Sequence, residues 1–325
     1  MIYTAADIHL GKSLRKKDIF KRDSYVSFED MVNKIIDDDE ESKSLILAGD
    51  ILEDNYITGD SLDILKRNIE KLKDNNIELY TLMGNHDYGE KSIPETQGAV
   101  NLNEKAVEID GYTVYGIDYR PPEIIKEKIN EAPECDILFL HQTFKHMLDF
   151  EDVYNISVYD IPGRIKNVVC GDIHIIDKRK TGNGYFLSPG SLHPNKLDED
   201  YDHGFWKFTG DDFEFIPVYH RKILRLSITD KEDIEEAEKS LKDLPEDPYS
   251  VAEVKYRSEF QSSAESLEDK YGNIIFITSV IPEESDDNIS ENTSAVSTME
   301  DKLPEEADPE ENSELYYFAE NLLKK

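Results

Sequence analysis

Polar residues of a few types follow one short apolar run after another, and this pattern constrains the fold more than any other feature of the chain. The apolar runs have the length and composition of β-strands. In open α/β sheets, ligands bind beyond the carboxyl ends of the strands. The polar residues are therefore expected to meet at one edge of the fold. They are Asp7, His9, Asp50, Asn85, His86, Asp87, His141, Asp172 and His174.

Apolar strands alternate with amphipathic helical patterns over roughly the first 220 residues, which predicts a layered α/β fold with largely parallel central strands. A hairpin is expected over 205–219, with Trp206 in its core. The expected helices are 23–39, 60–74 and 122–131. The expected strands are 2–6, 44–48, 77–83, 106–109, 112–117, 136–140, 167–170 and 184–187.

Three further segments follow residue 222. Residues 223–281 read as strand, helix, strand and strand, a small α/β cap whose helix is expected to begin with a capping box of Thr229 and Glu232. Residues 282–313 are strongly acidic and poor in apolar side chains, so we expect a disordered linker. Residues 314–325 have an apolar helical face suited to a partner's groove. Its candidate partner-binding residues are Leu315, Phe318 and Leu322.

The formal net charge is −34, which by itself argues against binding a polyanion. Residues 12–22 have the opposite charge balance, with six bases and one acid. Arg15, Lys16 and Lys17 are therefore candidate DNA contacts. Cys135 and Cys170 are expected to be core thiols in a reducing compartment. No apolar run approaches the ~20 residues that span a bilayer, so we expect a cytoplasmic protein without membrane attachment.

The strand-end residues offer carboxylate, amide and imidazole donors without a thiolate. This mixture suits manganese, iron or zinc better than magnesium or calcium. Two divalent ions about 3.5–4 Å apart can generate hydroxide and neutralise a phosphoryl group. Asp50 is the expected bridge between them, since Gly49 permits the tight turn that presents it.

His86 follows Asn85 and is expected to act outside the metal shell, where it stabilises the transition state or protonates the leaving oxygen. Asp87 is expected to orient His86 and raise its pKa. His193 follows a Ser-Pro-Gly-Ser segment and is a candidate contact at the substrate rim. His146, His203 and His220 have no motif context and are expected to be structural or surface residues.

With these residues in place, positions 1–222 resemble the SbcD / meiotic-recombination-eleven nuclease family, which includes subunits that bacteriophages encode. The resemblance implies a calcineurin-like metallophosphoesterase β-sandwich flanked by helices, with a small α/β cap. It is carried by Asp7-Ile-His9-Leu-Gly, Gly49-Asp50-Ile-Leu, Gly84-Asn85-His86-Asp87, His141-Gln142, and Leu187-Ser-Pro-Gly-Ser-Leu192 followed by Gly204-Phe205.

The resemblance implies how the metal ligands divide. The first metal would be held by Asp7, His9, Asp50 and His174, and the second by Asp50, Asn85, His141 and Asp172. It also implies manganese dependence, exonuclease action on duplex ends and endonuclease action on single strands. The implied partners are DNA, an SbcC-type coiled-coil ATPase and a second copy of the chain. Magnesium, iron and zinc remain alternatives to manganese.

Asp172 departs from the family pattern Gly-His-x-His. A third carboxylate lowers the net positive charge of the metal pair, which favours harder ions such as manganese. The side chain could also turn away and leave the second metal loosely held. Two other functions stay open: a calcineurin-like phosphatase or cyclic-nucleotide phosphodiesterase, and an architectural subunit with a weakened metal site.

Overall fold

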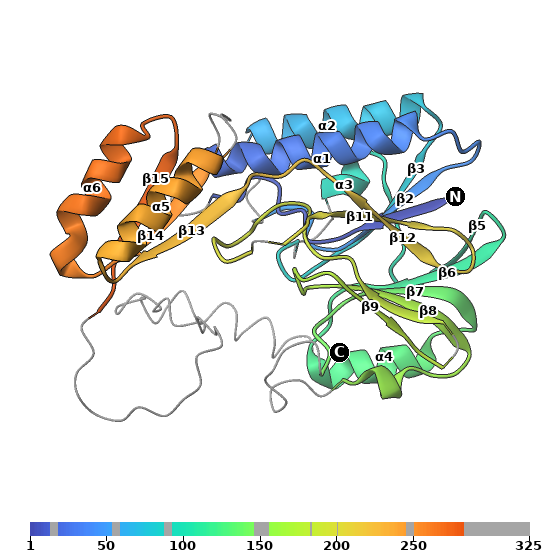
Figure 1. The fold of residues 1–325 in the computed structure, drawn as a ribbon. Helices are drawn as coiled ribbons and strands as arrows, with labels where there is room; N and C mark the ends of the chain where they lie inside the picture. Colours follow the sequence, from blue (N-terminus) through green and yellow to red (C-terminus); the bar gives the residue numbers. More distant parts are fainter. Residues whose placement is uncertain are drawn as a thin grey trace, which may run out of the picture. The chain divides into compact units, whose positions relative to one another are not determined.

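The computed structural model describes residues 1–13, 19–53, 59–87, 93–145, 156–182, 184–199, 201–244 and 250–282. Residues Met1–Ile281 form one compact unit (Figure 1). Some residues singled out from the sequence lie outside the described residues, and so does most of the acidic linker. They are Arg15, Lys16, Lys17, His146, Leu315, Phe318 and Leu322.

The first sheet is built around four parallel strands that follow one another in the chain. β1 pairs with β2, β2 with β3 and β3 with β4, all parallel, while β11 and β12 extend the other side in antiparallel pairing. In sheet order the strands are β12 (Phe213–Pro217), β11 (Gly204–Phe208), β1 (Ile2–Ala5), β2 (Ser44–Ala48), β3 (Glu78–Leu82) and β4 (Val100–Asn101).

The second sheet also has six strands and a parallel centre. β6, β7, β8 and β10 run parallel, and β5 and β9 close the two edges in antiparallel pairing. In sheet order the strands are β5 (Ala106–Ile109), β6 (Tyr112–Ile117), β7 (Cys135–His141), β8 (Ile165–Gly171), β10 (Tyr185–Ser188) and β9 (Asp177–Lys180).

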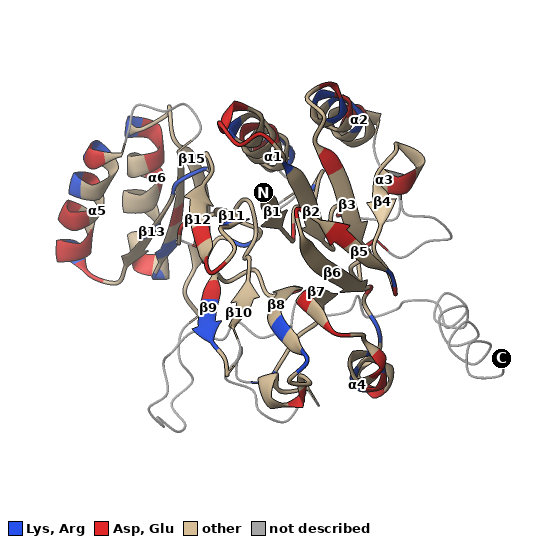
Figure 2. Ribbon diagram, turned by 90° about the vertical axis from the view of Figure 1, so that its right-hand side faces the viewer, with Lys and Arg blue, Asp and Glu red and all other residues tan. Residues whose placement is uncertain are grey.

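The sheets pack face to face between two layers of helices, as Figures 1 and 2 show. Fully buried side chains from both sheets, such as Ile46 and Phe139, fill the space between them. Outside the first sheet lie α1 (Ile19–Asp37) and α2 (Gly59–Asp74), and outside the second lies α4 (Pro122–Glu131). The predicted layered α/β sandwich is confirmed, and so are the buried thiols and the buried Trp206.

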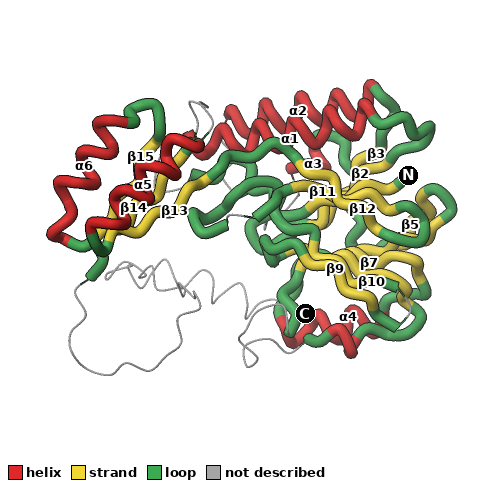
Figure 3. Tube along the Cα trace, viewed as in Figure 1, coloured by secondary structure: helices red, strands yellow, loops and turns green. Residues whose placement is uncertain are grey.

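A smaller three-stranded sheet follows, visible beside the sandwich in Figure 3. Its strands β13 (Ile223–Ile228), β14 (Val251–Tyr256) and β15 (Ile275–Val280) are all parallel. Helices α5 (Lys231–Asp243) and α6 (Gln261–Lys270) connect them and cover one face. On the other face Val251 packs against Phe20 of α1, which joins this sheet to the sandwich.

The structure changes several local expectations. Asp230, not Thr229, caps α5, and its reciprocal partner is Asp233 rather than Glu232. Helix α1 begins four residues earlier than its apolar pattern predicted. Short elements missing from the sequence prediction are α3 (Ile93–Thr96), β4, η2 (Val158–Asp160), β9, η3 (Ser258–Phe260) and α6. Among the described residues, no helix has the length and apolar character needed to cross a membrane.

Candidate metal centre

The carboxyl ends of β1, β2, β3, β7 and β8 come together at one place, called the ligand edge below. Backbone hydrogen bonds join the loops there. Asp7 N–H donates to the carbonyl of Gly49 at 3.1 Å, and His9 N–H donates to that of Asp50 at 2.9 Å. Asp172 N–H donates to both carboxylate oxygens of Asp7, at 3.1 and 3.2 Å. Loops from both sheets are therefore held as one structure.

Four candidate ligands have a left-handed backbone. The φ angles are 52° for Asp7, 44° for His9, 50° for Asp50 and 91° for Asp172. For a residue other than glycine, this conformation costs on the order of 1–3 kcal/mol and persists only where the surrounding structure imposes it. Such strain gathers at functional sites, and here it turns each side chain away from its strand toward the ligand edge.

Two glycines at the ligand edge leave room for ligands. A Cβ on Gly84 would lie 2.0 Å from Asp50 Oδ1, and one on Gly49 would lie 2.2 Å from His141 Nδ1. Gly49 also has a φ of 90°. Any side chain at either position would displace a candidate ligand, which explains why a glycine precedes Asp50 and Asn85.

One group of donor atoms lies around His9. Its Nε2 is 3.3 Å from His174 Nε2 and 3.6 Å from Asp50 Oδ2. Asp7, His9 and His174 each offer a donor atom within 4.8 Å of the other two. Two imidazole nitrogens at this distance form a hydrogen bond only if one of them carries a proton. If both are unprotonated, their lone pairs can bind a shared cation.

A second group lies around His141. Its Nε2 is 3.4 Å from Asp50 Oδ2, 3.2 Å from Asn85 Oδ1 and 4.0 Å from Asp172 Oδ1. The other oxygen of Asp172 accepts a hydrogen bond from the hydroxyl of Thr143. Asp172 thus faces the ligand edge through one oxygen, although it stands further from His141 than the other donors do. Asp50 Oδ2 faces both groups.

The histidines are oriented by oxygen atoms behind them. A ring nitrogen that faces an oxygen acceptor fixes the tautomer and leaves the other nitrogen for a metal. In all four rings Nδ1 is the nitrogen that faces oxygen. The contacts are His9 to Glu53 Oε2 at 2.9 Å, His86 to Glu53 O at 2.8 Å, His141 to Ala48 O at 2.7 Å and His174 to Glu199 Oε1 at 3.1 Å.

The charges at the ligand edge favour a bound cation. Asp7, Asp50 and His141 are all buried, and within the described residues no lysine or arginine forms an ion pair with either carboxylate. Burial raises the pKa of Asp7 to about 7. Burial would lower the pKa of His141, but Asp50 and Asp7 outweigh it and raise that pKa well above its usual value. Divalent ions would supply the missing positive charge, and the oxygen and imidazole donors fit them.

The expectation that Asp87 orients His86 is wrong. Both oxygens of Asp87 are engaged by backbone, with Gly84 and Leu52 each donating an N–H at 3.0 Å. Asp87 therefore ties the loop after β3 to the loop after β2, and burial raises its pKa. The ring of His86 is instead held by the carbonyl oxygen of Glu53.

The expectation that His193 lines the substrate rim is also wrong. The side chain is 2% exposed, and its two ring nitrogens lie 3.0 Å from the carbonyl oxygen of Ile8 and 3.1 Å from that of Pro194. Burial lowers its pKa to about 3. His193 thus supports the loop between Asp7 and His9 from behind. His203 was expected to be a structural or surface residue, and it is buried beside Ser191.

Three supporting residues were missed from the sequence. Glu53 contacts a ring nitrogen of His9, Glu199 contacts one of His174, and the hydroxyl of Thr143 donates to Asp172. Glu53 is itself paired with Lys12 at 3.0 Å. Glu199 lies 25 residues from His174 and has no apolar strand before it, so only the fold brings the two together. Thr143 and Glu53 stand two or three residues after a ligand, a signal too weak to single them out.

Comparisons with known proteins agree with this geometry. The calcineurin-like phosphoesterase family model matches residues 2–164. The DNA double-strand break repair protein Mre11 of Methanocaldococcus jannaschii is 26% identical over 303 residues, 83% of this chain and 80% of that protein. Mre11 of Sulfurisphaera tokodaii is 26% identical over 186 residues, 52% of this chain and only 47% of the relative. The expected resemblance to the SbcD / meiotic-recombination-eleven family is confirmed.

A solved structure, TT1561 of Thermus thermophilus, is similar with a TM-score of 0.44 and 12% identity, covering 67% of this chain and 98% of that one.

The glycine before Asn85 offers a test of the ligand edge. Gly84→Ala should lower metal-dependent phosphoesterase activity by about a hundredfold or more, because its methyl group would meet Asp50 Oδ1 and displace it. Gly182→Ala is the matched control, since a Cβ there meets nothing within 4 Å. Hydrolysis of para-nitrophenyl phosphate measures both. Equal activity of the two variants, with circular dichroism unchanged, would contradict the packing described.

Proposed function

This chain belongs to the calcineurin-like phosphoesterase family, and we propose that it is a metal-dependent nuclease that hydrolyses phosphodiester bonds of DNA in repair, recombination or replication. One observation carries the proposal. Asp50 Oδ2 lies 3.6 Å from His9 Nε2 and 3.4 Å from His141 Nε2, so a single carboxylate faces both donor groups. A shared carboxylate is what a two-metal phosphoesterase requires.

The choice of DNA rests on the relatives and on one segment. The relatives named above are DNA double-strand break repair proteins. The segment Ser188–Ser191, which resembles the nuclease branch, supports the loop of His174: Ser188 Oγ donates to the carbonyl of Ile175 at 2.8 Å, and Ser191 N–H donates to that of His174 at 3.0 Å. The segment thus contributes to the metal site itself.

The residues of the ligand edge have different roles. In our proposal Asp7, His9 and His174 hold one divalent ion, His141, Asn85 and Asp172 hold the other, and Asp50 holds both. When bound, the ions supply hydroxide at neutral pH and neutralise the phosphoryl oxygens. Glu53 and Glu199 keep the metal-binding nitrogens of His9 and His174 pointed inward.

His86 takes the proton-transfer role. Its backbone N–H donates to Asp50 Oδ1 at 2.9 Å, which places it against the centre, and Nδ1 faces the carbonyl of Glu53. In the imidazolium form, with Nδ1–H on that carbonyl, Nε2–H would give its proton to the departing oxygen and leave the neutral ring. Manganese as the preferred ion, exonuclease action on duplex ends and endonuclease action on single strands are the finer parts of the proposal.

The substrate is tested by a manganese-dependent assay on duplex DNA, single-stranded DNA and para-nitrophenyl phosphate. We expect cleavage of DNA, abolished by a chelator. His86→Gln should lower turnover by about 10²–10⁴-fold, the usual contribution of a general acid, with substrate affinity kept. His220→Gln is the matched control and should keep full turnover. Activity confined to the small phosphate ester would contradict the DNA proposal, and full turnover in His86→Gln would contradict the proton-transfer role.

We further propose that residues 314–325 bind an SbcC-type coiled-coil ATPase through Leu315, Phe318 and Leu322. The support is the apolar spacing of these residues in the sequence. Co-purification of such an ATPase with the full chain should be lost when 314–325 are deleted and kept when 300–311 are deleted. Retention by the first variant would rule out this docking segment.

A further inference from the structure

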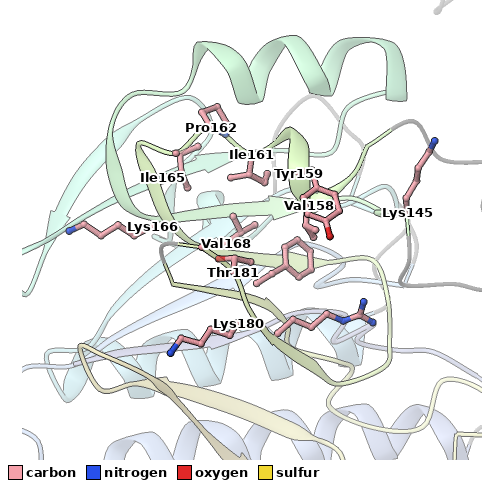
Figure 4. Close-up of a pocket in the computed structure, with 14 residues that line it drawn as sticks. Lys145, Val158, Tyr159, Ile161, Pro162, Ile165, Lys166, Val168, Lys180 and Thr181 are labelled. Atoms are coloured by element: carbon pink, nitrogen blue, oxygen red, sulfur yellow. The ribbon is translucent and has the colours of Figure 1, made fainter.

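A pocket of about 630 Å³ opens on the outer face of the second sheet, over β8, β9 and β10 and beside η2 (Figure 4). It lies toward the opposite end of the sheet from the ligand edge. Ile165 and Lys166, which line it, begin β8, whereas Gly171 ends that strand beside the candidate metal ligands. The pocket is therefore separate from the site described above.

The lining of this pocket differs from the rest of the chain. Its 14 lining residues include four bases and no acid, in a protein with 71 acidic and 37 basic residues. The bases are Lys145, Lys166, Arg179 and Lys180. Such a lining in an acidic protein indicates an anionic ligand.

Two of the four bases have acidic partners outside the pocket lining. Lys166 pairs with Asp136, and Arg179 Nε lies 2.5 Å from Asp177 Oδ2. Among the described residues, Lys145 and Lys180 form no ion pair. Lys180 stands opposite Tyr185 in the β9–β10 pairing, on the other face of the sheet from Phe186 and Arg179, so Lys145 is the unpaired base on the side of the pocket.

The neighbouring acid on η2 is held mainly by a cation outside the pocket. Asp160 pairs with Lys126 of α4 at 2.8 Å and accepts the N–H of Ser157 at 3.0 Å. Its carboxylate thus pairs with Lys126 on α4 and interacts with Lys145 of the pocket only at longer range.

The floor and rim of the pocket are apolar and aromatic. Phe186 and Val168 form part of the floor, and both are buried in the core beneath α4. Tyr159 stands at the rim and is 88% exposed, the most exposed of the large hydrophobic side chains described. An aromatic ring left this open can stack on a flat ligand.

We propose that this basic pocket binds single-stranded DNA, with phosphates on the lysines and a base stacked on Tyr159. Positively charged grooves with exposed aromatic rings bind single strands in this way. A duplex presents phosphates, but its base faces are already stacked, so it could use the lysines and not Tyr159. This inference rests on the proposed function only for the choice of a nucleic acid ligand.

The test uses the full chain in chelator, so that hydrolysis is absent, and a fluorescein-labelled oligodeoxythymidylate. Tyr159→Ala should weaken binding by about fivefold or more, the lower bound for losing one stacked base. Lys145→Glu should also weaken binding, because it removes a phosphate contact and adds a carboxylate that repels the strand. Tyr219→Ala, at a 48% exposed tyrosine, and Lys73→Glu, on α2, are the matched controls. Lys145→Glu should reduce the slope of log affinity against log salt by about 0.7 for each phosphate that is no longer neutralised.

Competition identifies the ligand class. Unlabelled single strand should displace the probe at lower concentration than duplex or a Glu- and Tyr-containing peptide. Affinities unchanged in both pocket variants would overturn the proposal, and so would stronger displacement by the peptide or the duplex. Metal-dependent hydrolysis of para-nitrophenyl phosphate should be unaffected by either variant. A failure of DNA cleavage would therefore count against the proposed function. Unchanged oligonucleotide affinity in the two pocket variants would count against the pocket alone.

Discussion

The carboxylate of Asp50 is the contact on which the rest of the site depends. One oxygen accepts the N–H of His86, and the other faces His9 and His141. The residue follows β2, which has β1 and β3 as neighbours, so the loops of three adjacent strands surround it. Its left-handed backbone is held by the loops on both sides.

The sequence was informative where chemistry and strand pattern coincide. Every candidate ligand follows an apolar run, and parallel strands bring their carboxyl ends to one edge, so convergence of these residues was predictable. The supporting residues were not. Glu199 reaches His174 only because the chain between them folds back through β9 and β10. Nothing in local spacing indicates such a contact.

The same division applies to the roles of individual side chains. Asp87 and His193 carry the right chemistry for a site, yet Asp87 binds backbone and His193 is buried behind the ligand loop. Residue type could be read from the sequence, but side-chain direction could not.

Two elements were missed because their sequences lack a clear apolar pattern. Strand β9 (Asp-Lys-Arg-Lys) lacks apolar alternation because it is an edge strand, and α6 buries only Ala264 and Leu267. Parallel pairing of β14 with β15 requires a crossover such as α6.

The number of bound ions tests the shared carboxylate most directly. Manganese bound per chain can be measured by equilibrium dialysis and elemental analysis for the wild type, Asp50→Asn and the surface control Asp63→Asn. A bridging Asp50 predicts about two ions in the wild type and in the control. It also predicts that Asp50→Asn weakens both sites together. One ion in the wild type, or loss of a single site in Asp50→Asn, would contradict a centre built on this carboxylate.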